Sequence, residues 1–120
     1  MNYENDLIEQ FQERGISLGS ELYLPLEVAL ELVQWCDNRH LAVVGVEGFI
    51  WDSKHLMSQM DIIADFSLSG ARRIHDWAEY VSKCNSLAKE YLPNISEREG
   101  LVINLTVLSE KEWMHYRNQT

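Results

Sequence analysis

Three carboxylates are the residues of this chain whose types and positions could do chemistry: Glu47, Asp61 and Asp65. A polar, turn-like segment beginning at Asp52 separates the first from the other two, so a hairpin would place them on neighbouring strands. In one register of that hairpin the odd-numbered residues share a face, because side chains alternate along a strand. Acid–base catalysis needs carboxyl groups in different environments, and magnesium needs several converging oxygens. A small enzyme or metal-binding protein is therefore one alternative, which a one-residue slip of register would remove.

The chain lacks the usual signatures of catalytic and cofactor sites. Gly45, Gly48 and Gly70 have neither the spacing of a phosphate-binding loop nor its Lys-Ser/Thr, and there is no GxSxG segment. The four histidines occur singly, with no HExxH or HxH pair. We therefore expect no catalytic residue, no metal ligand and no cofactor. The carboxylates then form either a solvated acidic face or an acidic surface that binds a protein.

The negative charge is unevenly distributed along the sequence. The net charge is −9, and residues 1–65 hold 12 acidic against three basic residues, whereas residues 66–120 are balanced. A nucleic-acid-binding protein needs the opposite sign, so this class is excluded. An acidic first half suits solubility, or the electrostatic steering of a basic protein partner.

Length and composition are typical of one globular domain over residues 1–120, with 46% hydrophobic and 24% charged residues. No apolar run is long enough for a membrane helix. The first ten residues are acidic where an export signal would be basic and then apolar, which predicts a cytoplasmic protein. Cys36 and Cys84 both fall in expected helices and are interpreted as buried, reduced thiols.

Apolar periodicity predicts an α+β fold: a small, mainly antiparallel sheet of three to four strands packed with three to four helices. Two serines are expected helix caps: Ser69, and Ser109 in a capping box with Glu112. The elements that we expect are helices over Tyr3–Glu13, Pro25–Arg39, Ala71–Leu92 and Glu110–Arg117, strands over Leu41–Trp51, Met60–Phe66 and Leu101–Leu108, and a short extended piece at Glu21–Leu24.

Two features of the central helix and strand need a neighbour or a distortion. The apolar arc of the helix over Pro25–Arg39 is wider than one contact requires, so a second element is expected beside Trp35. If no element covers it, Trp35 and its neighbours could form the interface of a homodimeric structural or adaptor module, a further alternative function. Gly45 and Gly48 interrupt the following strand, which predicts a bend or bulge there.

The central unit resembles small immunity proteins of bacterial polymorphic toxin and contact-dependent growth inhibition systems. The resemblance lies in a helix ending in Trp35-Cys36, a short polar turn and the strand LAVVGVEGFIW, in which Val46 replaces a second glycine and Glu47 takes the acidic position. The pieces that match are Ala42–Trp51, Trp77–Cys84 and Leu101–Leu108. Such proteins catalyse nothing and neutralise a cognate toxin, often a nuclease with a basic cleft, by one-to-one binding in the cytoplasm.

The resemblance implies a non-enzymatic toxin inhibitor. We expect neither nucleic acid nor membrane as a partner, from the charge and the lack of a long apolar run, and we expect a monomer or weak homodimer. An inhibitor of this kind can occupy a basic cleft with carboxylates and aromatic anchors. The partner-binding residues that we expect lie at the end of the central strand and on the next strand: Glu47, Trp51, Asp52, Asp61 and Asp65.

Overall fold

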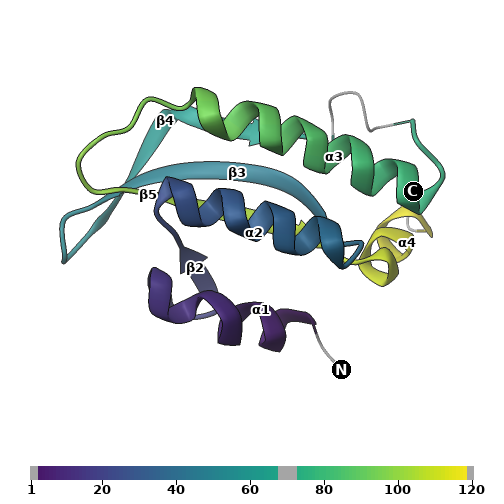
Figure 1. Ribbon diagram of the computed structural model, residues 1–120, viewed down its shortest axis with the longest axis horizontal. Helices are drawn as coiled ribbons and strands as arrows, with labels where there is room; N and C mark the ends of the chain where they lie inside the picture. The colour runs from purple at the N-terminus through teal and green to yellow at the C-terminus, as the bar shows by residue number, and fades with distance from the viewer. Residues whose placement is uncertain (1–2, 68–72, 119–120) are drawn as a thin grey trace.

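The computed structural model describes residues 3–67 and 73–118 and has the expected α+β architecture (Figure 1). A three-stranded antiparallel sheet has the strand order β4-β3-β5, and a separate two-stranded hairpin, β1-β2, lies near its β5 edge. The α-helices and strands, with two 3-10 turns, are α1 (Tyr3–Phe11), η1 (Gln12–Arg14), β1 (Ile16–Leu18), β2 (Glu21–Tyr23), α2 (Leu26–Asn38), β3 (Ala42–Trp51), β4 (Leu56–Asp65), α3 (Trp77–Tyr91), η2 (Leu92–Asn94), β5 (Leu101–Leu108) and α4 (Glu110–Asn118).

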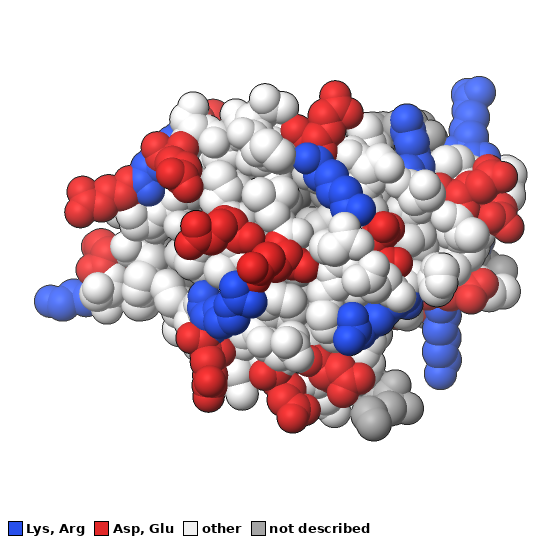
Figure 2. Space-filling model, viewed as in Figure 1, with Lys and Arg blue, Asp and Glu red and all other residues white. Residues whose placement is uncertain are grey.

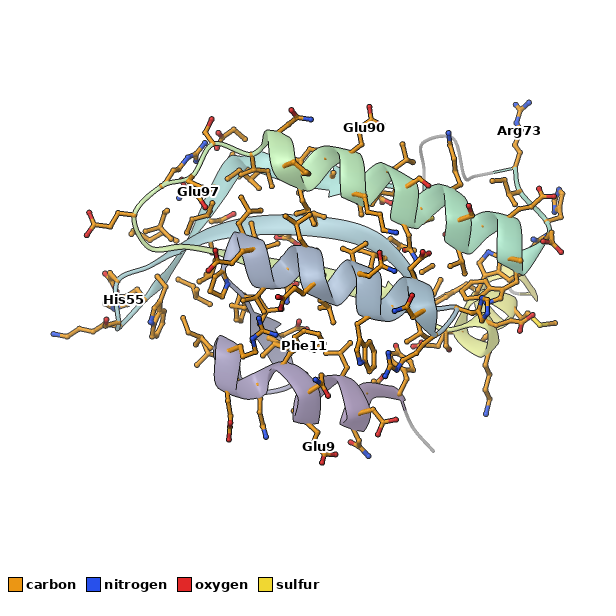
Figure 3. The ribbon with its side chains drawn as sticks, viewed as in Figure 1. Glu9, Phe11, His55, Arg73, Glu90 and Glu97 are labelled. Carbon is orange, nitrogen blue, oxygen red and sulfur yellow. The ribbon has the colours of Figure 1, made fainter. Side chains whose placement is uncertain are left out.

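The helices and the sheet form two layers. Helices α2 and α3 contact each other and lie against the sheet, in front of it in Figure 1. α1 flanks α2 on its other side, where the Phe11 and Trp35 rings meet edge to face at 6.0 Å. Figure 3 shows Phe11 pointing from α1 toward α2, and Glu9 pointing away from it. The expected second neighbour of Trp35 is therefore α1. An uncovered Trp35 was the reason to consider a homodimer through this side chain, and that reason no longer applies.

The junction between α2 and β3 is as short as the sequence predicts. His40 has a positive φ of 56°, and the backbone N–H of Leu41 donates to the carbonyl of Cys36 at 2.9 Å. These are the features of a Schellman ending, which stops the helix and turns the chain at once into the strand. The most apolar helix and strand of the chain are thereby held against each other.

A buried amide ties this junction to α3. Asn85 is 1% exposed, and its Oδ1 accepts a hydrogen bond from the Val43 backbone N–H at 2.8 Å. Its Nδ2 donates to the Leu41 carbonyl and to Asp37 Oδ1, both at 3.0 Å. Lys89 Nζ lies 3.1 Å from the other oxygen of Asp37. The pKa of Asp37 is lowered, first by the hydrogen bond from Asn85 and then by Lys89, with burial opposing them.

The starts of α3 and β4 differ from the sequence-based expectations, and one strand was not expected. α3 begins at Trp77 and not at Ala71, because the Asp76 side chain caps it by accepting from the Glu79 backbone N–H at 3.1 Å. The expected cap Ser69 and the residue Ala71 lie outside the described residues. β4 begins at Leu56 and not at Met60, so the connection between β3 and β4 is only four residues long. β1 was not expected from the sequence.

The capping box of α4 is present. The Ser109 Oγ accepts from the Glu112 backbone N–H at 3.2 Å, while Glu112 Oε1 accepts from the Ser109 backbone N–H at 2.9 Å and from the Tyr3 hydroxyl at 2.7 Å. Burial would raise the pKa of Glu112, but these hydrogen bonds outweigh it and lower the pKa. The bond from Tyr3 ties α1 to the far end of the chain.

Both cysteines are buried free thiols, as the sequence indicated. Burial raises the pKa of Cys36 to about 12 and that of Cys84 to about 11, so both stay protonated at neutral pH. Among the helices within residues 3–67 and 73–118, none has the length and apolar character that a membrane span requires.

Candidate functional site

The candidate site is the face of the sheet that α2 and α3 leave uncovered, which we call the open face. Cross-strand partners share a face in an antiparallel sheet, so the pairs Glu47↔Ile63 and Gly45↔Asp65 place these four residues together. β5 adds Asn104 opposite Glu47 and Thr106 opposite Gly45, and on the same side of β3 and β4 lie Phe49, Trp51, Leu56 and Ser58. The prediction that Glu47, Trp51 and Asp65 share a face is confirmed.

The prediction that Asp61 joins this face is wrong. The register between β3 and β4 shifts at Glu47/Gly48, so that Met60, Asp61 and Ile62 have no partner on β3. Asp61 instead makes a two-pronged ion pair with Arg98, one arm of which is a 3.0 Å bond from Nη1 to Oδ1. The hydrogen bond from Arg98 lowers the pKa of Asp61. The three carboxylates therefore do not form one cluster.

Asp52 is also separate from the open face. It begins the β3–β4 turn, where its Oδ1 accepts from the backbone N–H groups of Lys54 at 2.9 Å and His55 at 2.7 Å. The His55 bond is the largest of the causes that lower the pKa of Asp52. Figure 3 places His55 at the tip of this hairpin, which projects beyond the helices. Asp52 thus shapes the turn and stands at the end of the molecule.

The glycines of β3 lie at the two distortions of the sheet, as their positions in the sequence predicted. Register shifts occur between Val43 and Gly45 on the β5 side and at Gly48 on the β4 side. A Cβ on Gly48 would lie 2.6 Å from the Ile62 side chain, so close packing requires this glycine. A Cβ on Gly45 would make only ordinary contacts, the nearest at 3.5 Å, so packing does not require glycine there.

The missing side chain at Gly45 leaves a hollow in the open face. Its volume is about 240 Å³, and Glu47, Ile63, Asp65 and Thr106 lie around it. Asp65 Oδ1 accepts hydrogen bonds from both the backbone N–H and the hydroxyl of Ser67, which hold its carboxylate in place. Glu47 makes no hydrogen bond or ion pair with another described residue.

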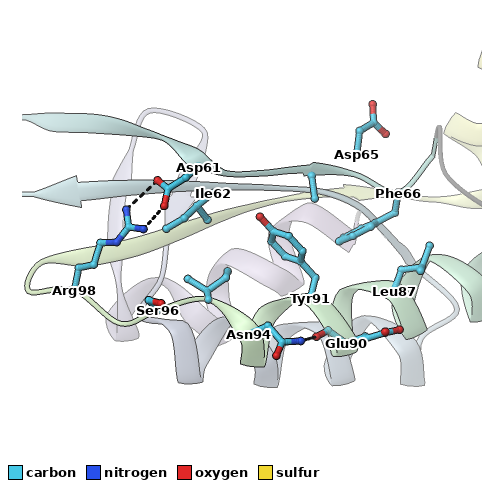
Figure 4. A pocket seen from close by; sticks show the side chains of 12 residues that line it. Asp61, Ile62, Asp65, Phe66, Leu87, Glu90, Tyr91, Asn94, Ser96 and Arg98 are labelled. Atoms are coloured by element: carbon cyan, nitrogen blue, oxygen red, sulfur yellow. Dashed lines mark hydrogen bonds and ion pairs between the residues drawn. The ribbon is translucent and has the colours of Figure 1, made fainter.

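A larger cleft of about 590 Å³ lies on the other side of β4, between this strand and α3. Figure 4 shows Tyr91 and Phe66 pointing into it, and the Asp61–Arg98 pair at one end. In the same view Asp65 points away from α3, toward the open face. β4 therefore separates the cleft from the open face and contributes a carboxylate to each.

β4 also carries exposed apolar side chains that sequence reasoning missed. Met57, Met60 and Ile63 are 48%, 82% and 61% exposed. Contiguous exposed apolar patches rimmed by polar residues mark interaction sites, whereas single exposed apolar residues are normal. Ile62 and Phe66 are buried in the core, whereas Met60, which strict alternation puts on the same side of the strand, is exposed where the register shifts.

The sheet is uniformly acidic, in contrast to the helix layer. The five strands contain four acidic residues, Glu21, Glu47, Asp61 and Asp65, and no Lys or Arg. Figure 2, which shows the helix side, has Lys and Arg side chains interspersed among Asp and Glu. Glu21 and Glu47 raise the pKa of the Tyr23 hydroxyl, after the larger effect of burial. The charged side chains that the strands can present to a ligand on the open face are therefore all negative.

The carboxylate group considered for catalysis or metal binding is not assembled among the described residues. Within the described residues, no three His, Cys, Asp or Glu side chains lie where they could hold a metal ion. The proposed Glu47/Asp61/Asp65 group is divided between the two sides of β4. What remains on the open face is acidic groups, an apolar side chain and half-buried aromatic rings, a composition suited to recognition of another protein.

Comparison of the chain with models of known protein families, with curated proteins and with solved structures gave no match.

Proposed function

We propose that this protein is an inhibitor of the immunity type, which binds a basic toxin domain one-to-one in the cytoplasm and blocks it. One observation carries the proposal: edge strand β4 presents exposed apolar and acidic side chains on both of its sides. Ile63 and Asp65 lie on the open face, Met57 and Asp61 lie on the opposite side, and Met60 lies in the unpaired segment between them. Flexible Met side chains adapt to a partner surface, and carboxylates attract a basic one. The resemblance of the β3 region to immunity proteins points the same way.

The open face supplies the rest of the surface. The Tyr23 and Phe49 rings meet edge to face at 5.3 Å beside Glu47, and Trp51 is half-buried further along β3. Aromatic side chains in such settings are common anchors of binding energy. A standard interface of about 800 Å² per partner would occupy about a tenth of the 7509 Å² surface.

Binding by the side chains of the sheet fits better than addition of a strand to its edge. The unpaired residues 60–62 form a bulge in β4, and bulges disrupt the regular row of backbone groups that an added strand would need. Arg98 further holds the side chains of Gln59 and Asp61 at this edge. We therefore place the partner on the open face and on the exposed side chains of β4.

The direct test is binding to the product of the adjacent gene, as the candidate toxin. We expect a one-to-one complex by size-exclusion chromatography with light scattering, and restored growth in cells that express both proteins. The variant Glu47→Lys should weaken binding at least about tenfold, because it reverses a charge at the centre of the surface. The matched control Glu9→Lys makes the same change on α1 and should bind as the natural protein does.

Association kinetics give a second measurement. If the acidic strands steer a basic partner, added salt lowers the on-rate while the off-rate changes comparatively little. Absence of both binding and growth protection would overturn the proposal. Equal weakening by Glu47→Lys and Glu9→Lys would show that the interface lies elsewhere.

A further inference from the structure

The hollow at Gly45 has the dimensions and the chemistry of a receptor for one side chain. Its volume of about 240 Å³ leaves room for more than one water molecule, and it is open to solvent. Val44 and Ile63 provide apolar lining, while the Thr106 hydroxyl and two carboxylates provide polar lining. A side chain that is apolar along its length and charged at its end fits this arrangement.

The two carboxylates are placed to act together. Glu47 and Asp65 are diagonal neighbours across the β3–β4 pair, which separates their Cα atoms by about 7–8 Å. Ser67 orients the Asp65 carboxylate, which as a group can accept about four hydrogen bonds. A planar guanidinium with five donors can reach two carboxylates at once, whereas an ammonium is a compact point charge.

We propose that the hollow at Gly45 binds an arginine side chain of the protein partner, with its guanidinium between Glu47 and Asp65 and its methylene groups against Ile63. The inference rests on the proposed function, which it deepens by naming the partner group that the open face recognises. Charge complementarity selects this occupant, since the strands carry acidic groups and no basic ones. A second copy of the chain is a poor occupant, because this face would meet like charges.

Gly45 is the specificity determinant in this arrangement. Any larger residue there would fill the hollow, yet a Cβ at this position meets the Ala64 carbonyl oxygen and the Thr106 Cβ and Oγ1 at an ordinary 3.5 Å. Its φ is not in the left-handed region either. Substitution of Gly45 can therefore remove the binding of a side chain without a clash in the core.

A small probe tests this independently of any toxin. The full chain, labelled with ¹⁵N, is titrated with the tripeptide acetyl-Gly-Arg-Gly-amide and followed by NMR. We expect saturable shifts of the amides of Gly45, Glu47 and Asp65. The citrulline tripeptide, which is neutral but similar in shape, should bind about tenfold more weakly, because the charge-assisted hydrogen bonds are lost. The lysine tripeptide should also bind more weakly than the arginine one.

Variants test whether the tripeptide binds at the hollow. Gly45→Val and Glu47→Gln should both lose the saturable shifts, and Glu47→Gln removes a charge without altering the volume of the hollow. Asp61→Asn removes the same charge on the other side of β4 and should retain them. Thermal unfolding of each variant confirms that it is folded.

Three results would overturn the inference: no saturable shift, equal binding of the citrulline or lysine tripeptide, or shifts centred on Arg98. None of these results bears on binding to the adjacent gene product. If the protein does not bind the adjacent gene product but still binds the arginine tripeptide, the proposed toxin inhibition is refuted and the hollow remains an arginine-binding site.

Discussion

The Asn85 side chain is the polar group on which the packing of α2, α3 and β3 depends most directly, and Asn85→Ala tests it. The change removes the acceptor for the Val43 N–H and one donor each to the Leu41 carbonyl and Asp37. Val43 is 0% and Leu41 7% exposed, so water has little access to either residue. Each buried polar group left unpaired costs about 1–3 kcal/mol.

The two backbone groups alone then predict a loss of about 3 kcal/mol in the free energy of unfolding. This is a large part of the roughly 5–15 kcal/mol that stabilises a typical domain. At about 3–5 °C per kcal/mol for a chain of this size, Tm should fall by roughly 10–15 °C. Urea denaturation and differential scanning calorimetry measure both quantities.

Two further variants make the result specific to the hydrogen bonds. Asn38→Ala removes an amide of the same kind from the exposed surface of α2 and should change stability by less than about 0.5 kcal/mol. Asn85→Asp keeps an acceptor for Val43 but sets a second carboxylate beside Asp37. Its loss of stability should shrink as the pH falls from 7 toward 4, because protonation of one carboxylate relieves the repulsion. A loss below about 1 kcal/mol for Asn85→Ala would refute the reasoning.

Three more predictions follow from the same structure. Gly48→Ala should cost about 1–3 kcal/mol by urea denaturation, because its Cβ would collide with a β4 side chain at 2.6 Å, whereas Gly45→Ala should stay within about 1 kcal/mol. His40→Gly should stabilise the protein by less than about 1 kcal/mol and so raise Tm slightly, since glycine adopts the positive φ of 56° without strain. A lower Tm would contradict this. The folded-state pKa of Asp37 is lowered, so its contribution is complete above the unfolded value of about 4 and is lost as the pH falls through the folded value. Stability measured between pH 5 and 2 should therefore fall less steeply in Asp37→Asn than in the natural protein.

Local patterns of the sequence predicted much of the fold. Apolar periodicity identified α2, β3 and β5 within a few residues, and the spacing of Ser109 and Glu112 identified the cap of α4. Gly45 and Gly48 marked the distortions of β3. These features depend on residues close together in the chain, so that propensity, capping and alternation determine them before any tertiary contact forms.

The sequence also predicted part of the candidate site. The alternation of side chains correctly placed Glu47, Trp51 and Asp65 on one face, because the hairpin is regular on either side of the register shift. The same argument placed Asp61 wrongly. Asp61 is one of three β4 residues without a partner on β3, and it pairs instead with Arg98, 37 positions along the chain. A register is a relation between two strands, and neither strand alone encodes it.

What the tertiary structure alone decided is which surface stays open. The sequence showed three apolar side chains on β4 without indicating that Met57, Met60 and Ile63 are exposed, and it showed Asn85 inside a helix without its three hydrogen bonds. It predicted a distortion at Gly45 but not the hollow between Glu47, Asp65 and Thr106. The physical reason is that burial, pairing and empty volume are properties of several segments packed together, whereas periodicity and capping are properties of one.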